Sequence, residues 1–222
     1  MGKLIVFEGV DGSGKSTQYR RLCQRLEREG RDFRSLVFPQ YDEPSSALIR
    51  MYLAGEFGDK PSDVNAYAAS AFFAVDRYAS YKKSWGAYYE AGGLIVTDRY
   101  TTSNAVHQAS KLPAAEREDY LRWLFEFEYD KLGLPAPDLV LFCDVDLAVS
   151  LQHLRRRESE TNTHADIHER DESYLAASIE AARQAAGLCA WRRLDCGVAG
   201  VQRSVEEIGA EVDRAVEELC RI

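Results

Sequence analysis

The chain has 222 residues, 45% of them hydrophobic, which suits one α/β domain with a sizeable core. Its formal net charge of -8 disfavours a general affinity for nucleic acid or for an anionic membrane surface, because neither attracts a protein of that overall sign. We therefore expect no nucleic-acid or membrane partner, and any site for an anion must be local.

The five cysteines form no CxxC pair and are odd in number, which argues against a zinc site or a disulfide framework. They are interpreted as reduced, mostly buried thiols. No apolar stretch approaches the ~18 residues of a membrane span, and Lys3 is followed by a strand pattern rather than a signal-peptide core. These features favour a cytoplasmic protein.

Apolar runs alternate with helical patterns along the chain. Short runs that are apolar on both sides are typical of parallel strands covered by helices, and they span residues 4–7, 34–39, 93–98, 138–145 and 190–196. The segments between them are long enough for right-handed crossover helices, which we expect at 15–29, 46–55, 63–90, 114–131, 147–157 and 171–188. A capping box from Ser204 to Glu207 opens a last helix.

This order of elements predicts a single α/β domain over residues 1–222, with a five-stranded parallel sheet flanked by helices on both faces. No repeat, low-complexity tract or interdomain linker interrupts it. The segment 155–171 is polar, charged and poor in apolar residues, and it is the one stretch that we expect to be loosely held.

The stretch FEGVDGSGKSTQ (7–18) matches the pattern G-x-x-x-x-G-K-[ST] between an apolar strand and an amphipathic helix. Glycines let successive backbone N–H groups turn inward around a phosphate, Lys15 reaches the outer phosphates, and the Ser16 hydroxyl can bind Mg²⁺. This context predicts a P-loop NTPase fold rather than an ordinary glycine-rich turn. The predicted nucleotide-binding residues are Gly9, Val10, Asp11, Gly12, Ser13, Gly14, Lys15, Ser16 and Thr17.

Asp98 ends a neighbouring strand pattern, LIVTD, where a carboxylate can hold the Mg²⁺ shell through water. An aspartate that caps the next helix is the alternative interpretation. Arg99 follows at the carboxyl end of that strand, which is where α/β sheets bind their ligands.

Arg77 lies close to Phe73 in the stretch FFAVDRY (72–78). Arginine binds phosphate bidentately, and an aromatic face offers a base a stacking surface, so Arg77, Phe73 and Arg99 together indicate an acceptor nucleotide. The alternatives are a surface ion pair for Arg77 and a place in the helix core for one of the two phenylalanines, Phe72 and Phe73.

With these residues in place, the chain resembles the thymidylate kinases, which transfer the γ-phosphate of ATP to thymidine monophosphate (dTMP) and give dTDP and ADP in dTTP synthesis. The resemblance covers roughly Lys3 to Trp191 and is weak beyond it. The matching blocks, in order and with similar spacing, are FEGVDGSGKSTQ (7–18), FPQY (38–41), FFAVDR (72–77), DRYTTSNAVHQ (98–108), FEYDKLGLPAPDL (127–139) and IHERD (167–171). The resemblance implies ATP as phosphate donor, Mg²⁺ and a homodimer.

The resemblance also implies an acceptor site. In it, Phe73 stacks on thymine, Arg77 hydrogen-bonds an exocyclic oxygen of the base, and Arg99 binds the acceptor phosphate. Asp11 orients the acceptor phosphate and its magnesium, or the sugar hydroxyl, while Lys15 holds the donor phosphates. The implied substrate-binding residues are Phe38, Pro39, Tyr41, Arg50, Phe73, Arg77, Arg99, Ser103, Asn104, His107 and Gln108.

Two positions depart from the pattern of the family. Gln40 follows the Phe-Pro pair where many relatives carry an arginine for the acceptor phosphate, and Arg50 is the candidate to replace it, with a surface arginine as the alternative. His107 stands where some relatives have an aromatic residue that favours deoxyribose, which leaves open how strictly the sugar is selected.

The phosphate loop lacks the catalytic arginine that one sub-class of the family carries there, so a mobile lid at approximately 155–170 must supply positive charge. We expect Arg155 or Arg157 to close over the phosphates, with Arg170 as second choice, although consecutive arginines at a helix end also suit its dipole. The implied metal residues are Ser16, Asp98 and Glu169. The implied catalytic residues are Lys15, Arg99, Asp11, Arg155, Arg157 and Arg170.

Other functions stay open at this point. One is a kinase for another nucleoside monophosphate or for a deoxynucleoside, the latter needing a general base and no second phosphate clamp. A P-loop switch ATPase, from a different class, would not need Phe73, Arg77 and Arg99 to converge on an acceptor. Selection of thymine over uracil depends on the space around one methyl group, worth only ~1–3 kcal/mol.

Overall fold

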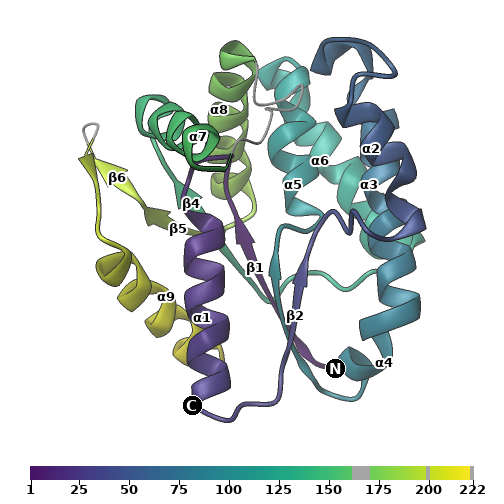
Figure 1. Ribbon diagram of the computed structural model, residues 1–222. Helices are drawn as coiled ribbons and strands as arrows, with labels where there is room; N and C mark the ends of the chain where they lie inside the picture. Colours follow the sequence, from purple (N-terminus) through teal and green to yellow (C-terminus); the bar gives the residue numbers. More distant parts are fainter. Residues whose placement is uncertain (162–170, 199–200, 221–222) are drawn as a thin grey trace.

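The computed structural model describes residues 1–161, 171–198 and 201–220. Five parallel strands form one sheet in the order β2-β3-β1-β4-β5 (Figure 1). These strands are β1 (Lys3–Glu8), β2 (Arg34–Val37), β3 (Leu94–Asp98), β4 (Leu139–Asp144) and β5 (Arg192–Asp195). The predicted five-stranded parallel sheet is confirmed: β1 extends one residue beyond its predicted run at each end, and the other strands are shorter than predicted by one or two residues at one or both ends.

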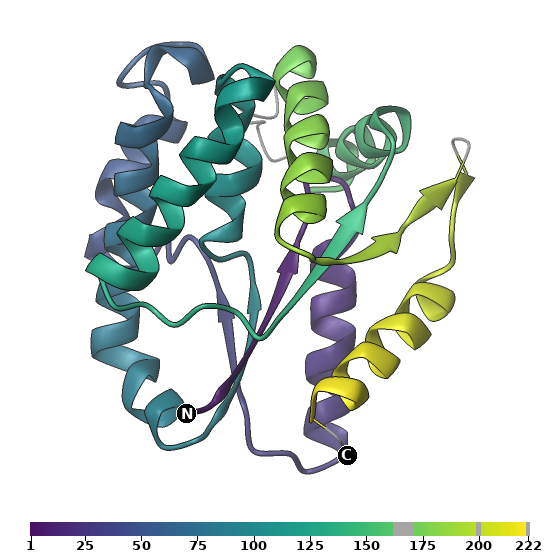
Figure 2. The same cartoon turned by 180° about the vertical axis from the view of Figure 1, so that it is seen from behind.

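Both faces of the sheet are covered by helices, as the two-sided apolar strands require (Figures 1 and 2). Alternate residues of β1 point to opposite layers. Ile5 and Phe7 pack with α1 (Lys15–Arg28) and α9 (Val205–Cys220). Leu4 and Val6 pack with the aromatic residues that follow α3.

The helices other than α1 and α9 differ in part from the prediction. They are α2 (Ala47–Leu53), α3 (Ala66–Ser80), α4 (Gly86–Glu90), α5 (Thr102–His107), α6 (Arg117–Phe125), α7 (Leu147–Thr161) and α8 (Glu172–Leu188). Short 3₁₀ turns lie at Pro44–Ser46, Pro61–Asp63, Ala109–Lys111 and Ala114–Glu116. The predicted helix 63–90 is interrupted by the π-helix Tyr81–Trp85, and the predicted helix 114–131 ends in the π-helix Glu126–Lys131.

One short helix and one two-stranded hairpin have no counterpart in the sequence prediction. α5 is short and follows β3 directly, and β6 (Gly197–Val198) pairs antiparallel with β7 (Val201–Gln202) as a small hairpin. The predicted capping box that opens α9 is confirmed, because Ser204 and Glu207 hydrogen-bond each other's backbone N–H groups.

The carboxyl ends of the parallel strands meet at one edge of the sheet. The glycine-rich loop leaves β1 there, Asp98 is the last residue of β3 and Arg99 follows it, and Phe38 follows β2. This edge is where ligands of open α/β sheets bind, so the fold brings the predicted site residues to the same place. Among the described residues, no helix combines the length and the apolar character that a membrane crossing needs.

Candidate active site

The glycine-rich loop is shaped by left-handed backbone and by α7. Gly12 and Gly14 have φ angles of 75° and 85°, and a Cβ at Gly12 would lie 2.5 Å from the backbone oxygen of Ser150. Ser150 Oγ donates a hydrogen bond to the Asp11 backbone oxygen at 2.6 Å, and His153 Nδ1 lies 2.7 Å from that of Gly12. Ser13 N–H also donates within the loop, to the Val10 backbone oxygen at 3.2 Å. With the loop held in this way, the N–H groups at the start of α1 can serve an anion.

A cavity of about 550 Å³ opens in front of this loop. Its wall includes Asp98, Arg156, Arg157 and the loop residues from Asp11 to Thr17. Gln202, from the hairpin that the sequence prediction missed, also borders it. The predicted residues Gly9 and Val10 lie behind the wall: Gly9 N–H donates to Glu8 Oε1 at 2.8 Å, and Val10 is buried in the core.

Asp98 and Ser16 border the cavity together, as predicted for a Mg²⁺ site. Asp98 is only 5% exposed, and its Oδ1 has no hydrogen-bond partner among the described residues. A buried carboxylate oxygen without a donor is costly unless a cation or ordered water serves it, and hard divalent cations prefer oxygen ligands. These two residues therefore fit Mg²⁺. The third predicted metal residue, Glu169, lies outside the described residues.

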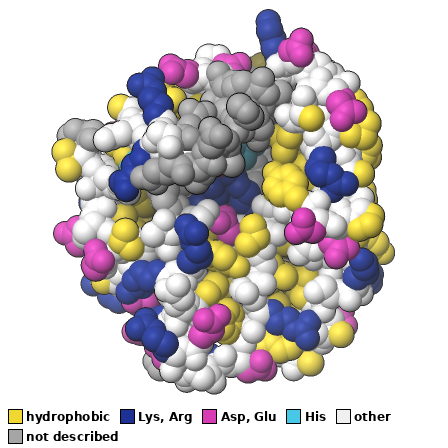
Figure 3. Space-filling model, in the orientation of Figure 1, with side chains coloured by type: hydrophobic (Ala, Val, Ile, Leu, Met, Phe, Trp, Pro, Cys, Tyr) yellow, Lys and Arg dark blue, Asp and Glu magenta, His cyan; other side chains and the backbone are white. Residues whose placement is uncertain are grey.

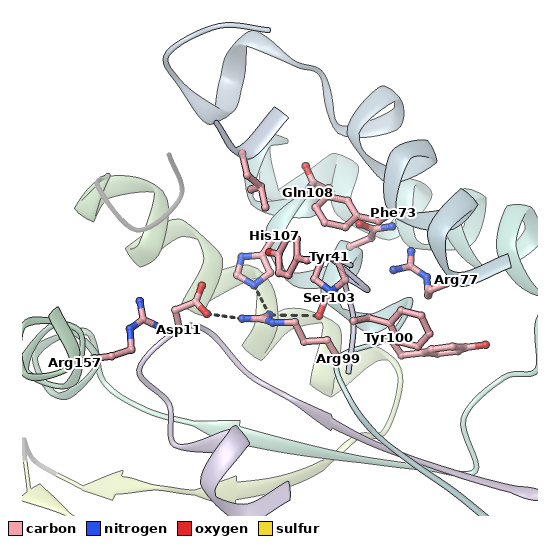
Figure 4. Close-up of a pocket in the computed structure, with 14 residues that line it drawn as sticks. Asp11, Tyr41, Phe73, Arg77, Arg99, Tyr100, Ser103, His107, Gln108 and Arg157 are labelled. Atoms are coloured by element: carbon pink, nitrogen blue, oxygen red, sulfur yellow. Dashed lines mark hydrogen bonds and ion pairs between the residues drawn. The ribbon is translucent and has the colours of Figure 1, made fainter. Parts of the chain in front are cut away.

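A second cavity, of about 240 Å³, adjoins the first (Figure 4). It holds all the predicted acceptor residues except Arg50. Arg50 instead bridges the loop before α2, where its Nη1 donates to the backbone oxygens of Tyr41 and Glu43 and to Ser46 Oγ. The wall consists of Asp11, Phe38, Pro39, Tyr41, Leu53, Phe73, Arg77, Arg99, Tyr100, Ser103, Asn104, His107, Gln108 and Arg157.

Arg99 lies at the junction of the two cavities, on a left-handed residue with a φ of 69°. Its Nη2 is 2.5 Å from Asp11 Oδ1, while its Nη1 is 2.9 Å from His107 Nε2 and 3.4 Å from Ser103 Oγ (Figure 4). Because a guanidinium only donates, the His107 nitrogen must accept this bond. Burial opposes the charge of Arg99, but the carboxylates around it prevail and raise its pKa, so the residue stays cationic.

Positive charge is concentrated where the two cavities meet. Lys15 Nζ lies 3.7 Å from Asp11 Oδ1, so this carboxylate stands between Lys15 and Arg99. Figure 3 shows Lys and Arg side chains in the hollow near the centre of this face. Such a cluster can bind two phosphate groups side by side despite the negative net charge of the chain.

Arg77 and Phe73 extend from α3 into the second cavity, the one of about 240 Å³, which is called the acceptor cavity below. Arg77 is 2% exposed and forms a bidentate ion pair with the fully buried Glu128, which rules out the surface ion pair considered above. Both phenylalanine rings pack against Tyr52, but only Phe73 lines the cavity. Phe72 is half-buried against Tyr52 and Phe57, which fits the packing interpretation for that residue.

The arginines at the start of the expected lid differ in whether they border the two cavities. Arg157 borders both cavities and Arg156 borders the loop cavity. The side chain of Arg155 is 74% exposed, lies 3.5 Å from Glu172, and borders neither cavity. Arg170 and the other expected lid residues from 162 onward lie outside the described residues.

Two buried carboxylates of the site were not assigned a role from the sequence. Glu8 ends β1 and accepts hydrogen bonds from Thr102 Oγ1 at 2.6 Å and Ser103 Oγ at 2.8 Å. Glu128 continues the buried face of α6, four residues after Leu124. A carboxylate at an apolar position of a strand or helix needs partners, and that signal was present in the sequence.

The fold and this pair of cavities define a P-loop nucleotide kinase. A family model described as thymidylate kinase matches residues 7–186. The chain is 34% identical over 176 residues to the thymidylate kinase of Mycobacterium tuberculosis (strain ATCC 25618 / H37Rv), covering 76% of this chain and 78% of that protein. It is 34% identical over 153 residues to that of Homo sapiens, covering 66% and 63%. The chain therefore belongs to the thymidylate kinase family.

A solved structure of thymidylate kinase from Candida albicans has the same fold. The TM-score is 0.68 over 98% of this chain and 92% of that chain, at 20% sequence identity. The predicted fold class and the resemblance to this family are confirmed. The roles of the individual site residues stay predictions.

Proposed function

We propose that this protein, as one domain over residues 1–222, transfers the γ-phosphate of ATP to dTMP and releases dTDP and ADP. The observation that carries this proposal is the meeting of the two cavities. Asp11, Arg99 and Arg157 border both of them, so a donor phosphate on the loop and an acceptor phosphate next to it share the same charged groups. A nucleoside kinase or a switch ATPase has no need of that second phosphate clamp.

The chemistry needs alignment and charge stabilisation rather than a covalent enzyme intermediate. Lys15 and the loop N–H groups hold the donor phosphates, and Arg99 holds the acceptor phosphate whose oxygen attacks. Because Asp11, His107 and Ser103 fix the Arg99 guanidinium, it is already oriented when charge develops on the transferred group.

Ser16 and Asp98 fit the role of magnesium residues, and Glu169 is the third candidate. When bound there, Mg²⁺ would supply positive charge that neutralises part of the charge of the donor phosphates. Of the two lid candidates in the described part of the chain, Arg157 is the better placed, because it borders both cavities while Arg155 lies next to Glu172. Arg170 stays a second choice.

We also propose a homodimer that forms through α3. Tyr67, Val75 and Tyr78 lie on one side of this helix, at spacings of eight and three residues, and are 44%, 52% and 38% exposed. Trp123 of α6 extends this surface, with its ring centroid 4.6 Å from that of Tyr67. A contiguous apolar surface of this kind is typical of a protein interface.

The first test is formation of ADP from ATP with Mg²⁺ and one acceptor at a time: dTMP, dUMP, UMP or thymidine, with products identified by chromatography. We expect dTDP from dTMP to form fastest. Conversion of thymidine but not of dTMP would make the protein a nucleoside kinase. Slow ATP hydrolysis that no acceptor changes would make it a switch ATPase.

A further inference from the structure

Glu128 lies behind the wall of the acceptor cavity, in the π-helix Glu126–Lys131, and is fully buried. Its Oε2 accepts hydrogen bonds from Arg77 Nε and Thr101 Oγ1, both at 2.7 Å. Its Oε1 accepts from Arg77 Nη2 and, at 3.2 Å, from Asn104 Nδ2. Each oxygen thus has two donors, and two of the three donor residues line the cavity.

The contact with Glu128 fixes what Arg77 can offer a ligand. Nε and Nη2 of the guanidinium both bind the carboxylate, so the plane of the group is held and Nη1 is its nitrogen that does not contact Glu128. Burial opposes the charge of Arg77, but the Glu128 carboxylate outweighs it and raises the pKa of the arginine. Arg77 therefore presents hydrogen-bond donors, and nothing else, to the cavity.

The same carboxylate fixes the orientation of the Asn104 amide. Asn104 Nδ2 donates to Glu128 Oε1 and, at 3.3 Å, to the backbone oxygen of Ser70. Both neighbours are acceptors, so the amide nitrogen has to face them. The side-chain oxygen then lies on the other side of the amide and accepts no hydrogen bond from the described residues. Asn104 therefore presents an acceptor to the cavity.

On the basis of the proposed function, we propose that Glu128 is a positioning residue. It holds a hydrogen-bond donor of Arg77 beside an acceptor of Asn104, and this pair selects the class of pyrimidine base. Thymine and uracil carry a carbonyl oxygen next to a ring N–H, which complements this pair. Cytosine carries an amino group next to an unprotonated ring nitrogen, so donor would face donor and acceptor would face acceptor. A site built to hydrogen-bond one pattern rejects the inverted pattern strongly.

The test is the variant Glu128→Gln, with Glu126→Gln as the matched control on the same π-helix, where Glu126 is exposed and paired with Lys131. The glutamine amide places a donor against Arg77 and lets the Asn104 amide turn over. Calorimetric titration without ATP gives the Kd values of dTMP, dUMP and dCMP, and steady-state assays give KM and kcat.

We expect the wild-type protein and Glu126→Gln to bind dTMP about 100-fold or more tighter than dCMP. Glu128→Gln should narrow this ratio at least ~10-fold, raising KM for dTMP more than it lowers kcat. The ratio of dTMP to dUMP should stay within ~2-fold, because both bases have the same edge. Equal weakening of all three nucleotides, or an unchanged ratio of dTMP to dCMP, would overturn the inference.

If Glu128→Gln does not fold, Thr101→Val replaces it, because it keeps the carboxylate and both charges and removes only one hydrogen bond to Glu128. It should narrow the ratio of dTMP to dCMP by a few-fold, and an unchanged ratio would again overturn the inference. A wild-type protein that neither binds nor phosphorylates dTMP would refute the proposed function itself. A wild-type protein that phosphorylates dTMP and dCMP equally well would refute only the role of Glu128.

Discussion

Arg157 and Arg155 are two residues apart on α7, yet only Arg157 borders the cavities. If the guanidinium of Arg157 stabilises the transferred phosphate, Arg157→Ala should lower kcat on the order of 10³-fold, as loss of a catalytic arginine does in related phosphoryl transfers. Arg155→Ala, which removes an exposed partner of Glu172, should stay within a few-fold of wild type. The measurement is kcat at saturating ATP and dTMP. Equal effects of the two substitutions would contradict this assignment.

At the scale of single residues, the sequence predicts those whose role follows from a local pattern. Lys15 and Ser16 belong to the glycine-rich motif that follows a strand pattern, and Asp98 and Arg99 lie at the end of another. All four border the same cavity. Glu128 could not be placed in the same way, because its partner Arg77 lies 51 residues away and the pairing depends on how α3 and α6 pack. Contacts of that range are determined by tertiary structure.

At the scale of elements, the segments 63–90 and 114–131 show a clear helical pattern but contain π-helical turns. The first turn carries Tyr81 and Trp85, both buried among the aromatic residues of the core. A π-helical turn contains more residues than an α-helical turn, so it changes which side chains face inward. The 3.6-residue periodicity of the sequence does not indicate where such a turn occurs. α5 was not predicted because it is short and most of its side chains are buried, so its sequence shows no amphipathic pattern.

Lys111 links three elements and supplies a prediction about stability. Its Nζ donates to Tyr52 Oη of α2 and to the Val64 backbone oxygen before α3, both at 2.9 Å. Burial lowers the pKa of Lys111 from 10.5 to about 7. Between these values the unfolded chain binds more protons than the folded chain at this residue, so the free energy of unfolding rises with pH in that window.

The variant Lys111→Met removes this titration. Between pH 7 and pH 9, the wild-type protein should gain ~2 kcal/mol of unfolding free energy relative to the variant. The measurement is urea unfolding of both proteins at the two pH values, where tyrosine and cysteine titrations cancel in the difference. A parallel pH dependence of the two proteins would show that Lys111 is protonated normally in the folded state.

At the scale of the whole molecule, the apolar surface of α3 and the acceptor cavity lie on the same helix. Phe73 and Arg77 of α3 reach the cavity, whereas Tyr67, Val75 and Tyr78 are exposed. An interface on the exposed side would therefore stabilise the helix that carries Phe73 and Arg77. Loss of the dimer should then also weaken acceptor binding. The sequence shows the spacing of these side chains but does not reveal that more than a third of each residue stays exposed in the folded chain.

Val75→Asp places a charge in the centre of this surface, and Val201→Asp is the matched control, since Val201 is 70% exposed on the β6–β7 hairpin, outside the proposed interface. Desolvating an unpaired carboxylate in an apolar interface costs several kcal/mol, enough to raise the dimer Kd by about 10³-fold or more. Light scattering at micromolar concentration should give a dimer for the wild-type protein and the control, and a monomer for Val75→Asp. A raised KM for dTMP in the monomer, with the KM for ATP unchanged, would tie the interface to the acceptor side of the site, whereas a monomeric wild-type protein would refute the dimer.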